Sequence, residues 1–211
     1  MRKRAEQVDQ TRERIVEAAV RLHGTVGPAG TSIAGIAREA GVTRLTVYRH
    51  FEDDDAIFAA CSAHWLAGQQ PPNPGAWAVV DGPLERLMAG LADLYRFFEE
   101  GQEMLSRIYR DLATLPDARR RAIEDRDAAI RRVLVEAFGD DANRRVTAAV
   151  GHATSFWTWH SLCVKHGLPT PDAVELMTAL VATALERAGR VASGDGASQA
   201  SFDASRGTAA T

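Results

Sequence analysis

Cysteine is scarce in this sequence of 211 residues, which contains only Cys61 and Cys163. Two thiols are too few for a disulfide framework or a cysteine-based zinc site, and we expect both to be small buried apolar residues. No apolar run approaches the roughly 20 residues that a membrane span requires. The first ten residues, MRKRAEQVDQ, lack the apolar stretch of a secretory signal. These absences predict a cytoplasmic protein without a membrane partner.

Motifs of catalysis and cofactor binding are absent as well. The sequence contains no P-loop, no glycine-rich dinucleotide turn, no nucleophile elbow and no HExxH metal pair. Its histidines are scattered, and the acidic pairs Glu99-Glu100 and Asp140-Asp141 lie at expected helix ends, as surface residues do. We therefore predict that the chain is not an enzyme and that it uses no metal and no cofactor.

The net charge of −3 conceals an uneven distribution along the chain. Residues 1–51 contain 9 Lys or Arg and 5 Asp or Glu, whereas residues 52–211 contain 16 and 23. A basic N-terminal part followed by an acidic remainder indicates that only the first part binds a polyanion such as DNA.

Nearly the whole chain has the composition and periodicity of α-helix. Apolar residues in a first helix, at about 11–26, share one face. Capping residues, glycine and proline separate further helices expected at about 33–40, 44–50, 54–70, 83–100, 102–113, 117–138, 142–166 and 172–191. The segment 71–75, PPNPG, is expected to be a loop, and residues 193–211 a disordered tail because they contain almost no large apolar side chain. The predicted fold class is all-α.

Residues 32–51, SIAGIAREAGVTRLTVYRHF, have the pattern of a helix-turn-helix. We expect Thr31 or Ser32 to cap the first short helix, Gly41 to form the turn and Thr43 to cap the second helix. In this motif the second helix enters the DNA major groove with its N-terminus leading. Its exposed residues are expected to be Arg44, Leu45, Thr46, Tyr48, Arg49 and His50. None of them is acidic, which suits a groove bordered by phosphates.

Residues 12–66 resemble the DNA-binding domain of the TetR family of transcriptional regulators. The matching residues are Arg12, Ile15, Ala18, Ala19, Gly27, Thr31, Ser32, Ile36, Ala37, Ala40, Gly41, Val42, Thr46, Val47, Tyr48, His50, Phe51 and Ile57. The resemblance implies a three-helix DNA-binding domain followed by a helical ligand-binding and dimerisation domain. It further implies a homodimeric repressor that a small-molecule effector releases from a palindromic operator in double-stranded DNA. The expected domains are a basic N-terminal arm (1–10), the helix-turn-helix domain (11–55), the effector-binding and dimerisation domain (56–192) and the tail (193–211).

The resemblance also implies roles for single residues. Thr43 and backbone amides at the helix starts after Thr31-Ser32 and Thr43 would hold phosphates, and Tyr48 and His50 would contact the DNA backbone. Base edges would be contacted by Arg44, Leu45, Thr46 and Arg49. Residues 2–4, RKR, are either a loose arm in the minor groove or merely a solubilising start.

Two residues depart from the family pattern. Leu45 replaces a residue that is usually glycine, and Asp54 stands where the family usually has lysine or arginine. An aspartate does not attract a phosphate, so the alternative is that Asp54 caps the fourth helix.

The C-terminal half contains two groups of candidate residues. Apolar stripes on the last two expected helices predict a dimer interface that includes Val146, Val150, Ala153, Trp157, Met177, Leu180, Val181 and Ala184. Aromatic and other apolar residues are candidates to line a pocket for a largely apolar effector: Trp65, Leu87, Leu91, Tyr95, Phe98, Met104, Ile108, Tyr109, Phe156, Trp157, Trp159 and His160. The alternative for both groups is that they form only the core of their own subunit.

Two other functions are compatible with the sequence. One is a helical binding protein or enzyme that inherited this fold, and the other is a DNA-bound regulator whose effector is a protein. Activation in place of repression is also open, and the operator, the effector and the regulated genes are not specified by the sequence.

Overall fold

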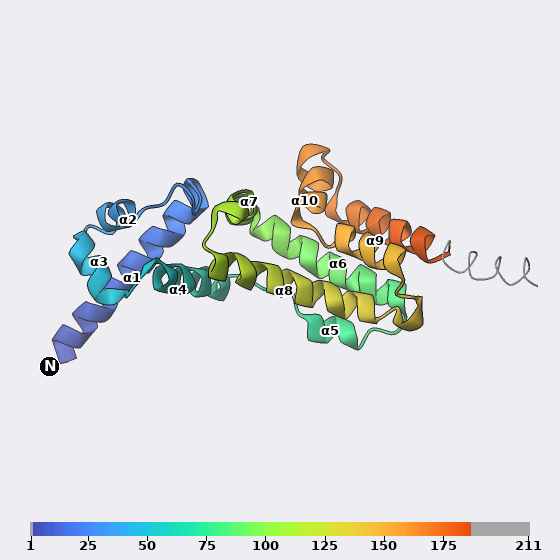
Figure 1. Cartoon of the computed structure of the whole chain (residues 1–211), viewed down its shortest axis with the longest axis horizontal. Coiled ribbons are helices and arrows are strands. Elements are labelled where there is room, and N and C mark those ends of the chain that lie inside the picture. Colours follow the sequence, from blue (N-terminus) through green and yellow to red (C-terminus); the bar gives the residue numbers. More distant parts are fainter. Residues whose placement is uncertain (1, 187–211) are drawn as a thin grey trace, which may run out of the picture. The chain divides into compact units, whose positions relative to one another are not determined.

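The computed structural model describes residues 2–186 of the chain, all of them in helices, turns and short connections (Figure 1). The first helices are α1 (Arg2–Thr25), α2 (Ile33–Glu39), α3 (Arg44–His50), α4 (Asp54–Ala67) and α5 (Pro74–Ala78). They are followed by α6 (Pro83–Glu100), α7 (Gln102–Asp111), η1 (Leu112–Thr114), α8 (Asp117–Glu136), η2 (Gly139–Asp141), α9 (Arg144–Ala153), α10 (Phe156–Trp159) and η3 (His160–Lys165). A last helix covers residues 170–186. No strand occurs in this described part, and the predicted all-α fold is confirmed.

The described residues form two compact units. The first contains the chain up to Pro72 together with Arg96–Asp127, and the second contains Asn73–Tyr95 together with the residues from Ala128 onward. Helices α6 and α8 therefore contribute residues to both units. The helix-turn-helix pattern lies entirely in the first unit, which also contains α1, α4 and α7.

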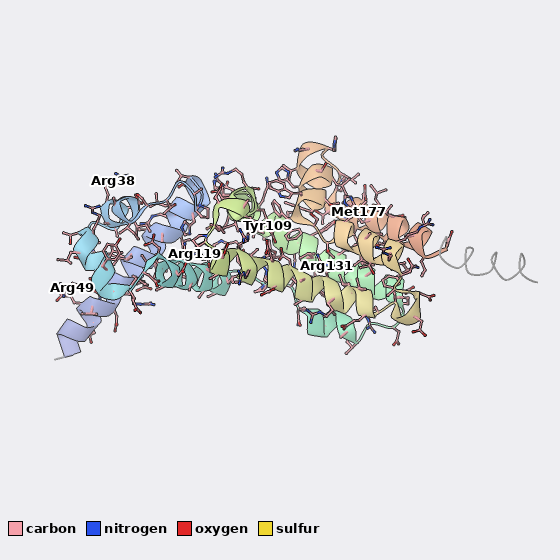
Figure 2. The ribbon with its side chains drawn as sticks, in the orientation of Figure 1. Arg38, Arg49, Tyr109, Arg119, Arg131 and Met177 are labelled. Atoms are coloured by element: carbon pink, nitrogen blue, oxygen red, sulfur yellow. The ribbon has the colours of Figure 1, made fainter. Side chains whose placement is uncertain are left out.

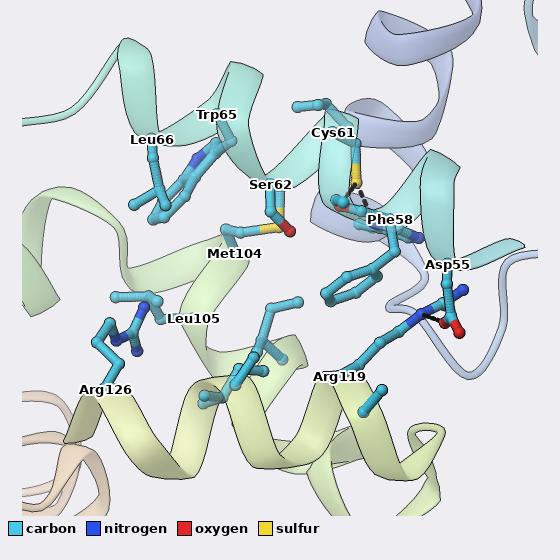
Figure 3. Close-up of a pocket in the computed structure, with 17 residues that line it drawn as sticks. Asp55, Phe58, Cys61, Ser62, Trp65, Leu66, Met104, Leu105, Arg119 and Arg126 are labelled. Atoms are coloured by element: carbon cyan, nitrogen blue, oxygen red, sulfur yellow. Dashed lines mark hydrogen bonds and ion pairs between the residues drawn. The ribbon is translucent and has the colours of Figure 1, made fainter. Parts of the chain in front are cut away.

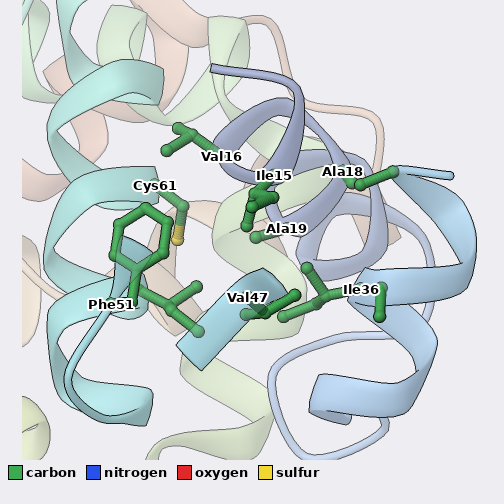
Figure 4. Packing of buried hydrophobic residues seen from close by; sticks show 11 residues of the cluster. Ile15, Val16, Ala18, Ala19, Ile36, Val47, Phe51 and Cys61 are labelled. Carbon is green, nitrogen blue, oxygen red and sulfur yellow. The ribbon is translucent and has the colours of Figure 1, made fainter. Parts of the chain in front are cut away.

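The core of the N-terminal helices is built on one face of α1 (Figure 4). Ile15, Ala18 and Ala19 are fully buried there and pack with apolar residues of α2, α3 and α4. Small alanines on this face allow neighbouring helices to approach closely, and Val47 and Phe51 fill the space next to them. This packing fixes which face of α3 is left outside.

Two helices differ from the sequence-based expectation: α1 starts earlier than expected, and α5 was not expected. Helix α1 begins at Arg2 and not at about Thr11, so residues 2–10 continue the first helix. Helix α5 forms inside the expected loop and just beyond it. Asn73 caps it by accepting a hydrogen bond from Ala76 N at 3.3 Å, and Pro74 suits its first turn because proline there removes no helical bond. Trp77 anchors α5 because its side chain is only 2% exposed.

The single helix expected at 142–166 is interrupted. Helix α9 ends at Ala153, Ser155 has extended backbone angles, and the chain continues as the short α10 and the π-helix η3. Side-chain hydroxyls take up carbonyls at the break: Thr154 Oγ1 donates to Val150 O at 2.9 Å, and Tyr95 Oη donates to Ala153 O at 2.7 Å. Such bonds compete with continuation of the helix. The tail expected at 193–211 lies outside the described residues.

Within residues 2–186 no helix combines the length and apolar character needed to cross a membrane. In the same part of the chain, no three His, Cys, Asp or Glu side chains converge to hold a metal ion.

Candidate nucleic-acid interface and ligand cavity

Two side-chain caps define the helix-turn-helix. Ser32 Oγ accepts a hydrogen bond from Gly35 N at 3.1 Å and caps α2, and Thr43 Oγ1 accepts from Thr46 N at 3.1 Å and caps α3. Of the two candidates for the first cap, Ser32 therefore fills the role, while the Thr31 hydroxyl donates to Gly27 O at 2.8 Å. Between the helices, Gly41 has a φ of +65°, a left-handed conformation that favours glycine.

Helix α3 presents one exposed face. Arg44, Leu45, Tyr48 and Arg49 occupy positions i, i+1, i+4 and i+5, which lie together on a helix, and all are exposed. Val47 on the opposite side is fully buried. The largest apolar exposure on this face is that of Leu45, at 71%. Figure 2 shows Arg49 of α3 and Arg38 of α2 with their side chains outside the helix bundle.

The other two candidate residues of α3 are less accessible. Thr46 and His50 are half-buried, and the Thr46 hydroxyl lies 2.9 Å from the Thr43 hydroxyl. Thr43 itself is exposed although its oxygen serves the cap. The exposed acid-free face of α3 therefore consists of two cations, one phenol and one leucine.

The start of α4 corrects the expectation for Asp54. Asp53, not Asp54, is the N-cap, because Asp53 Oδ1 accepts a hydrogen bond from Ala56 N at 2.7 Å. Asp54 is the first residue of the helix and is exposed. The third acid, Asp55, forms an ion pair and hydrogen bond with Arg119 Nε of α8.

A cavity of about 420 Å³ lies in the first unit, where α1, α4, α7 and α8 supply its walls (Figure 3). Its apolar lining includes Phe58, Trp65, Leu66, Met104, Leu105, Ile108 and Ile123, and its polar lining includes His23, Asp55, Ser62, Arg119 and Arg126. This volume lies within the range of small-molecule sites. Three of the residues expected in a pocket, Trp65, Met104 and Ile108, line this cavity.

The remaining residues expected in a pocket do not line this cavity. Leu87, Leu91 and Tyr95 are fully buried in the second unit, and Phe98 is buried as well. Phe156 packs in the second unit against the rings of Trp157, Trp159 and His160. Tyr109 is engaged through its hydroxyl, which donates to Asp127 Oδ2 at 2.8 Å. For these residues a role in an effector site stays a prediction, because helical spacing does not distinguish core aromatics from cavity walls.

Two titratable groups at the edge of the cavity are neutral at physiological pH. Burial, and secondarily the charge of Arg119, lowers the pKa of His23 to about 4. Burial raises the pKa of the Cys61 thiol to about 11. The two side chains are partners, with Cys61 Sγ and His23 Nδ1 3.2 Å apart. Neither is ionised near pH 7, so charge at this edge comes from Arg119 and Asp55.

A second polar contact joins α7 to the loop between α1 and α2. Asp111, only 6% exposed, accepts a hydrogen bond from Ala29 N at 3.1 Å. Its neighbour Arg110 donates to both Asp111 carboxylate oxygens and to Val26 O. The Arg110 hydrogen bond holds the pKa of Asp111 below its ordinary value. Sequence reasoning missed both Asp111 and Arg119, because a charged residue on an amphipathic helix normally faces solvent.

Most residues of the apolar stripes expected to form a dimer interface pack inside their own subunit. Five of the eight residues are buried in the second unit: Val146, Val150, Ala153, Met177 and Val181. These five side chains pack in the core of their own subunit, and a contact with a second copy stays a prediction. In the helix at 170–186, Leu180 of the predicted set is exposed at 42%, and Leu176, one turn earlier, is exposed at 48%. Trp157, at 46%, is exposed too, and Ala184 is half-buried.

Residues 15–61 match the family described as "Bacterial regulatory proteins, tetR family". The chain is 40% identical over 58 residues to the HTH-type transcriptional regulator AcrR of Shigella flexneri, covering 28% of this chain and 27% of that protein. It is 38% identical over 71 residues to SrpR of Pseudomonas putida, covering 34% and 32%. The matched regions thus span about a third or less of these two relatives. HbdR of Aromatoleum sp. (strain CIB) is 27% identical over 127 residues, which are 60% of this chain and 56% of that protein.

Solved structures share the fold over most of the chain. A TetR-like transcriptional regulator from Rhodococcus sp. RHA1 superposes with a TM-score of 0.57 at 18% identity, covering 83% of this chain and 96% of that one. A regulator from Clostridium perfringens gives a TM-score of 0.56 at 18% identity, with 80% and 96% covered.

The fold and the N-terminal site together define an all-α helix-turn-helix protein with a helical C-terminal part. The family match over residues 15–61, the related sequences and the shared fold agree, and the helix-turn-helix of this chain is similar to that of the TetR family of bacterial regulatory proteins.

Proposed function

We propose that the chain is a DNA-binding transcriptional regulator, a homodimeric repressor that a small, largely apolar effector releases from a palindromic operator. The observation that carries the DNA-binding part is the exposed face of α3, where Arg44, Leu45, Tyr48 and Arg49 lie together without an acid. Arginine can donate two hydrogen bonds to guanine, and leucine can contact a thymine methyl group. The phenol suits phosphates, which position the protein without specifying sequence.

The effector part of the proposal is supported by the cavity. It has mostly apolar walls, a volume of about 420 Å³ and a few polar groups at its edges. Two of its walls are α1 and α4, which also form the core of the helix-turn-helix domain. A molecule that fits this cavity better in one arrangement of these helices would shift the population toward that arrangement.

The dimer part is supported by the exposed apolar residues Leu176 and Leu180, which lie one turn apart on the helix at 170–186. A dimer would present two α3 helices to the two half-sites of a palindrome.

The experiment is a fluorescence-anisotropy titration of the full chain against fragments of the DNA upstream of its own gene and against random DNA. We expect specific binding by the wild type, and Arg44→Ala should relax discrimination at one base pair in each half-site by about 1–3 kcal/mol. Arg121→Ala, a change at an arginine of α8 that is 70% exposed, is the matched control. Equal weakening of operator and random DNA by Arg44→Ala would show that Arg44 contacts phosphate and not a base. No preference for any upstream fragment in the wild type would contradict operator binding there.

A further inference from the structure

The guanidinium of Arg119 is only partly satisfied at the edge of the cavity. Its side chain is 13% exposed, its Nε donates to Asp55, and its Cζ lies 4.7 Å from the centre of the Phe58 ring. Its Nη2 is buried and has no hydrogen-bond partner among the described residues. Figure 3 shows Arg119 extending from α8 beside Phe58 toward Asp55. A buried N–H group without an acceptor is unfavourable, so this atom favours a ligand that brings one.

The second cation of the cavity is already neutralised. Arg126 Nη2 donates to Tyr109 Oη at 3.1 Å and to Asp127 Oδ1 at 3.0 Å. Asp127 therefore supplies an adjacent counter-charge and Tyr109 a second acceptor. The counter-charge of Arg119, Asp55, is 53% exposed and can turn toward water when another anion arrives. Arg119 is thus the better of the two cations for a new anionic partner.

We propose that the cavity binds an apolar molecule carrying one carboxylate, which accepts hydrogen bonds from Arg119 while its apolar body lies among Phe58, Trp65 and Ile123. The planar guanidinium suits a carboxylate because it can offer two parallel N–H donors. The aromatic and aliphatic walls suit a flat or chain-like hydrocarbon body. This inference rests on the proposed function in that it treats the cavity as the effector site, and it adds the chemical class of the effector.

The same geometry gives the ligand a route to the helix-turn-helix. Asp55 belongs to the first turn of α4, directly after α3 and its C-cap Phe51. A carboxylate on Arg119 competes with Asp55 and removes the ion pair that joins α8 to this turn. The N-cap of α4 at Asp53 does not involve Arg119, so α4 keeps its cap when the Asp55–Arg119 ion pair is lost. By linkage, an arrangement that favours the Asp55 pair binds the carboxylate less tightly.

The test uses isothermal titration of the DNA-free full chain with 2-naphthoate and with 2-naphthalenemethanol, a neutral probe of the same body. We expect the wild type to bind the acid roughly tenfold more tightly or better, because a hydrogen bond to a charged group contributes more than a neutral one. Arg119→Gln should abolish this preference. Asp55→Asn should increase the affinity for the acid but not for the alcohol, because it removes the carboxylate that competes for Arg119. Arg121→Gln, at a well-exposed arginine of the same helix, should change neither affinity.

Each result decides the inference. Equal affinity for acid and alcohol, or binding of neither, would overturn it, and so would an unchanged acid affinity in both Arg119→Gln and Asp55→Asn. If Arg119→Gln does not fold, the higher acid affinity expected for Asp55→Asn still tests the inference. Asp55 is half exposed and asparagine has nearly the same shape as aspartate, so this variant should fold. The titration contains no DNA. A chain that binds the acid through Arg119 but never releases DNA would refute the proposed repressor mechanism and leave this inference standing.

Discussion

Replacing His23 is a direct test of the electrostatics at the edge of the cavity. His23 is 6% exposed, lies 3.2 Å from the Cys61 sulfur and has a pKa lowered to about 4, mainly by burial. In the unfolded chain a histidine takes up its proton near 6.5. The unfolded state therefore binds the proton first as the pH falls. As a result, His23 does not lower the free energy of unfolding above pH 6.5. The free energy of unfolding declines between pH 6.5 and about 4, and this group lowers it no further below that.

The size of the effect follows from the two pKa values. The difference between 6.5 and about 4 corresponds to roughly 3 kcal/mol of unfolding free energy lost across this window. We expect urea denaturation at a series of pH values to show this decline in the wild type. His23→Gln, which cannot take up the proton, should remove most of it, whatever its stability at neutral pH. His64→Gln on α4, at an exposed histidine, is the control and should keep the wild-type decline.

A direct measurement checks the cause. The imidazole proton signals of His23, followed by NMR against pH, should titrate with a midpoint well below that of a free histidine. A midpoint near 6.5, or the same pH dependence in His23→Gln as in the wild type, would refute the reasoning from burial.

Three further changes test other parts of the structure. Asp54→Lys leaves the Asp53 cap intact. If α4 starts at a phosphate, this change should steepen the salt dependence of DNA affinity by about 0.9 log units per log unit of salt for each phosphate, or roughly 1.8 in a dimer. The same change of slope in Asp140→Lys would show that the effect comes only from net charge. Leu180→Arg should convert a dimer to a monomer in sedimentation velocity, and a monomeric wild type would contradict the proposed interface. Thr43→Ala should lower the free energy of unfolding by about 1 kcal/mol in denaturant titrations, because it removes the α3 cap, whereas Thr43→Ser should not.

The helix-turn-helix could be predicted from sequence because its determinants are local. Ser32 and Thr43 cap the helices that directly follow them, and Gly41 adopts the left-handed conformation that the turn requires. Val47 is buried and Leu45 exposed because residues two positions apart lie on nearly opposite sides of an α-helix. The error at the start of α4 arose where three aspartates in succession are all acceptable caps. The DNA contacts assigned to α3 remain predictions.

The C-terminal half was less predictable because distant residues decide it. The break after α9 is stabilised by the hydroxyl of Tyr95, which lies 58 positions earlier in the chain. Helical periodicity correctly marks Met177 and Val181 as apolar positions, but it does not tell whether the surface they pack against belongs to the same subunit. The structure shows that it does, and that Leu176 and Leu180 are the exposed pair.

Two charged residues of the first unit were missed for a related reason, because a sequence assigns the charged side chains of an amphipathic helix to the surface. Asp111 holds the loop between α1 and α2, and Arg119 holds the first turn of α4. Both therefore act on segments that flank the helix-turn-helix, in which α3 carries the exposed cations. Polar contacts suit this position because an ion pair can exchange one partner for another with little change in packing, whereas an apolar core resists partial opening. A ligand that competes for Arg119, as proposed above, would exchange one ion-pair partner for another at the first turn of α4, which follows α3 in the chain.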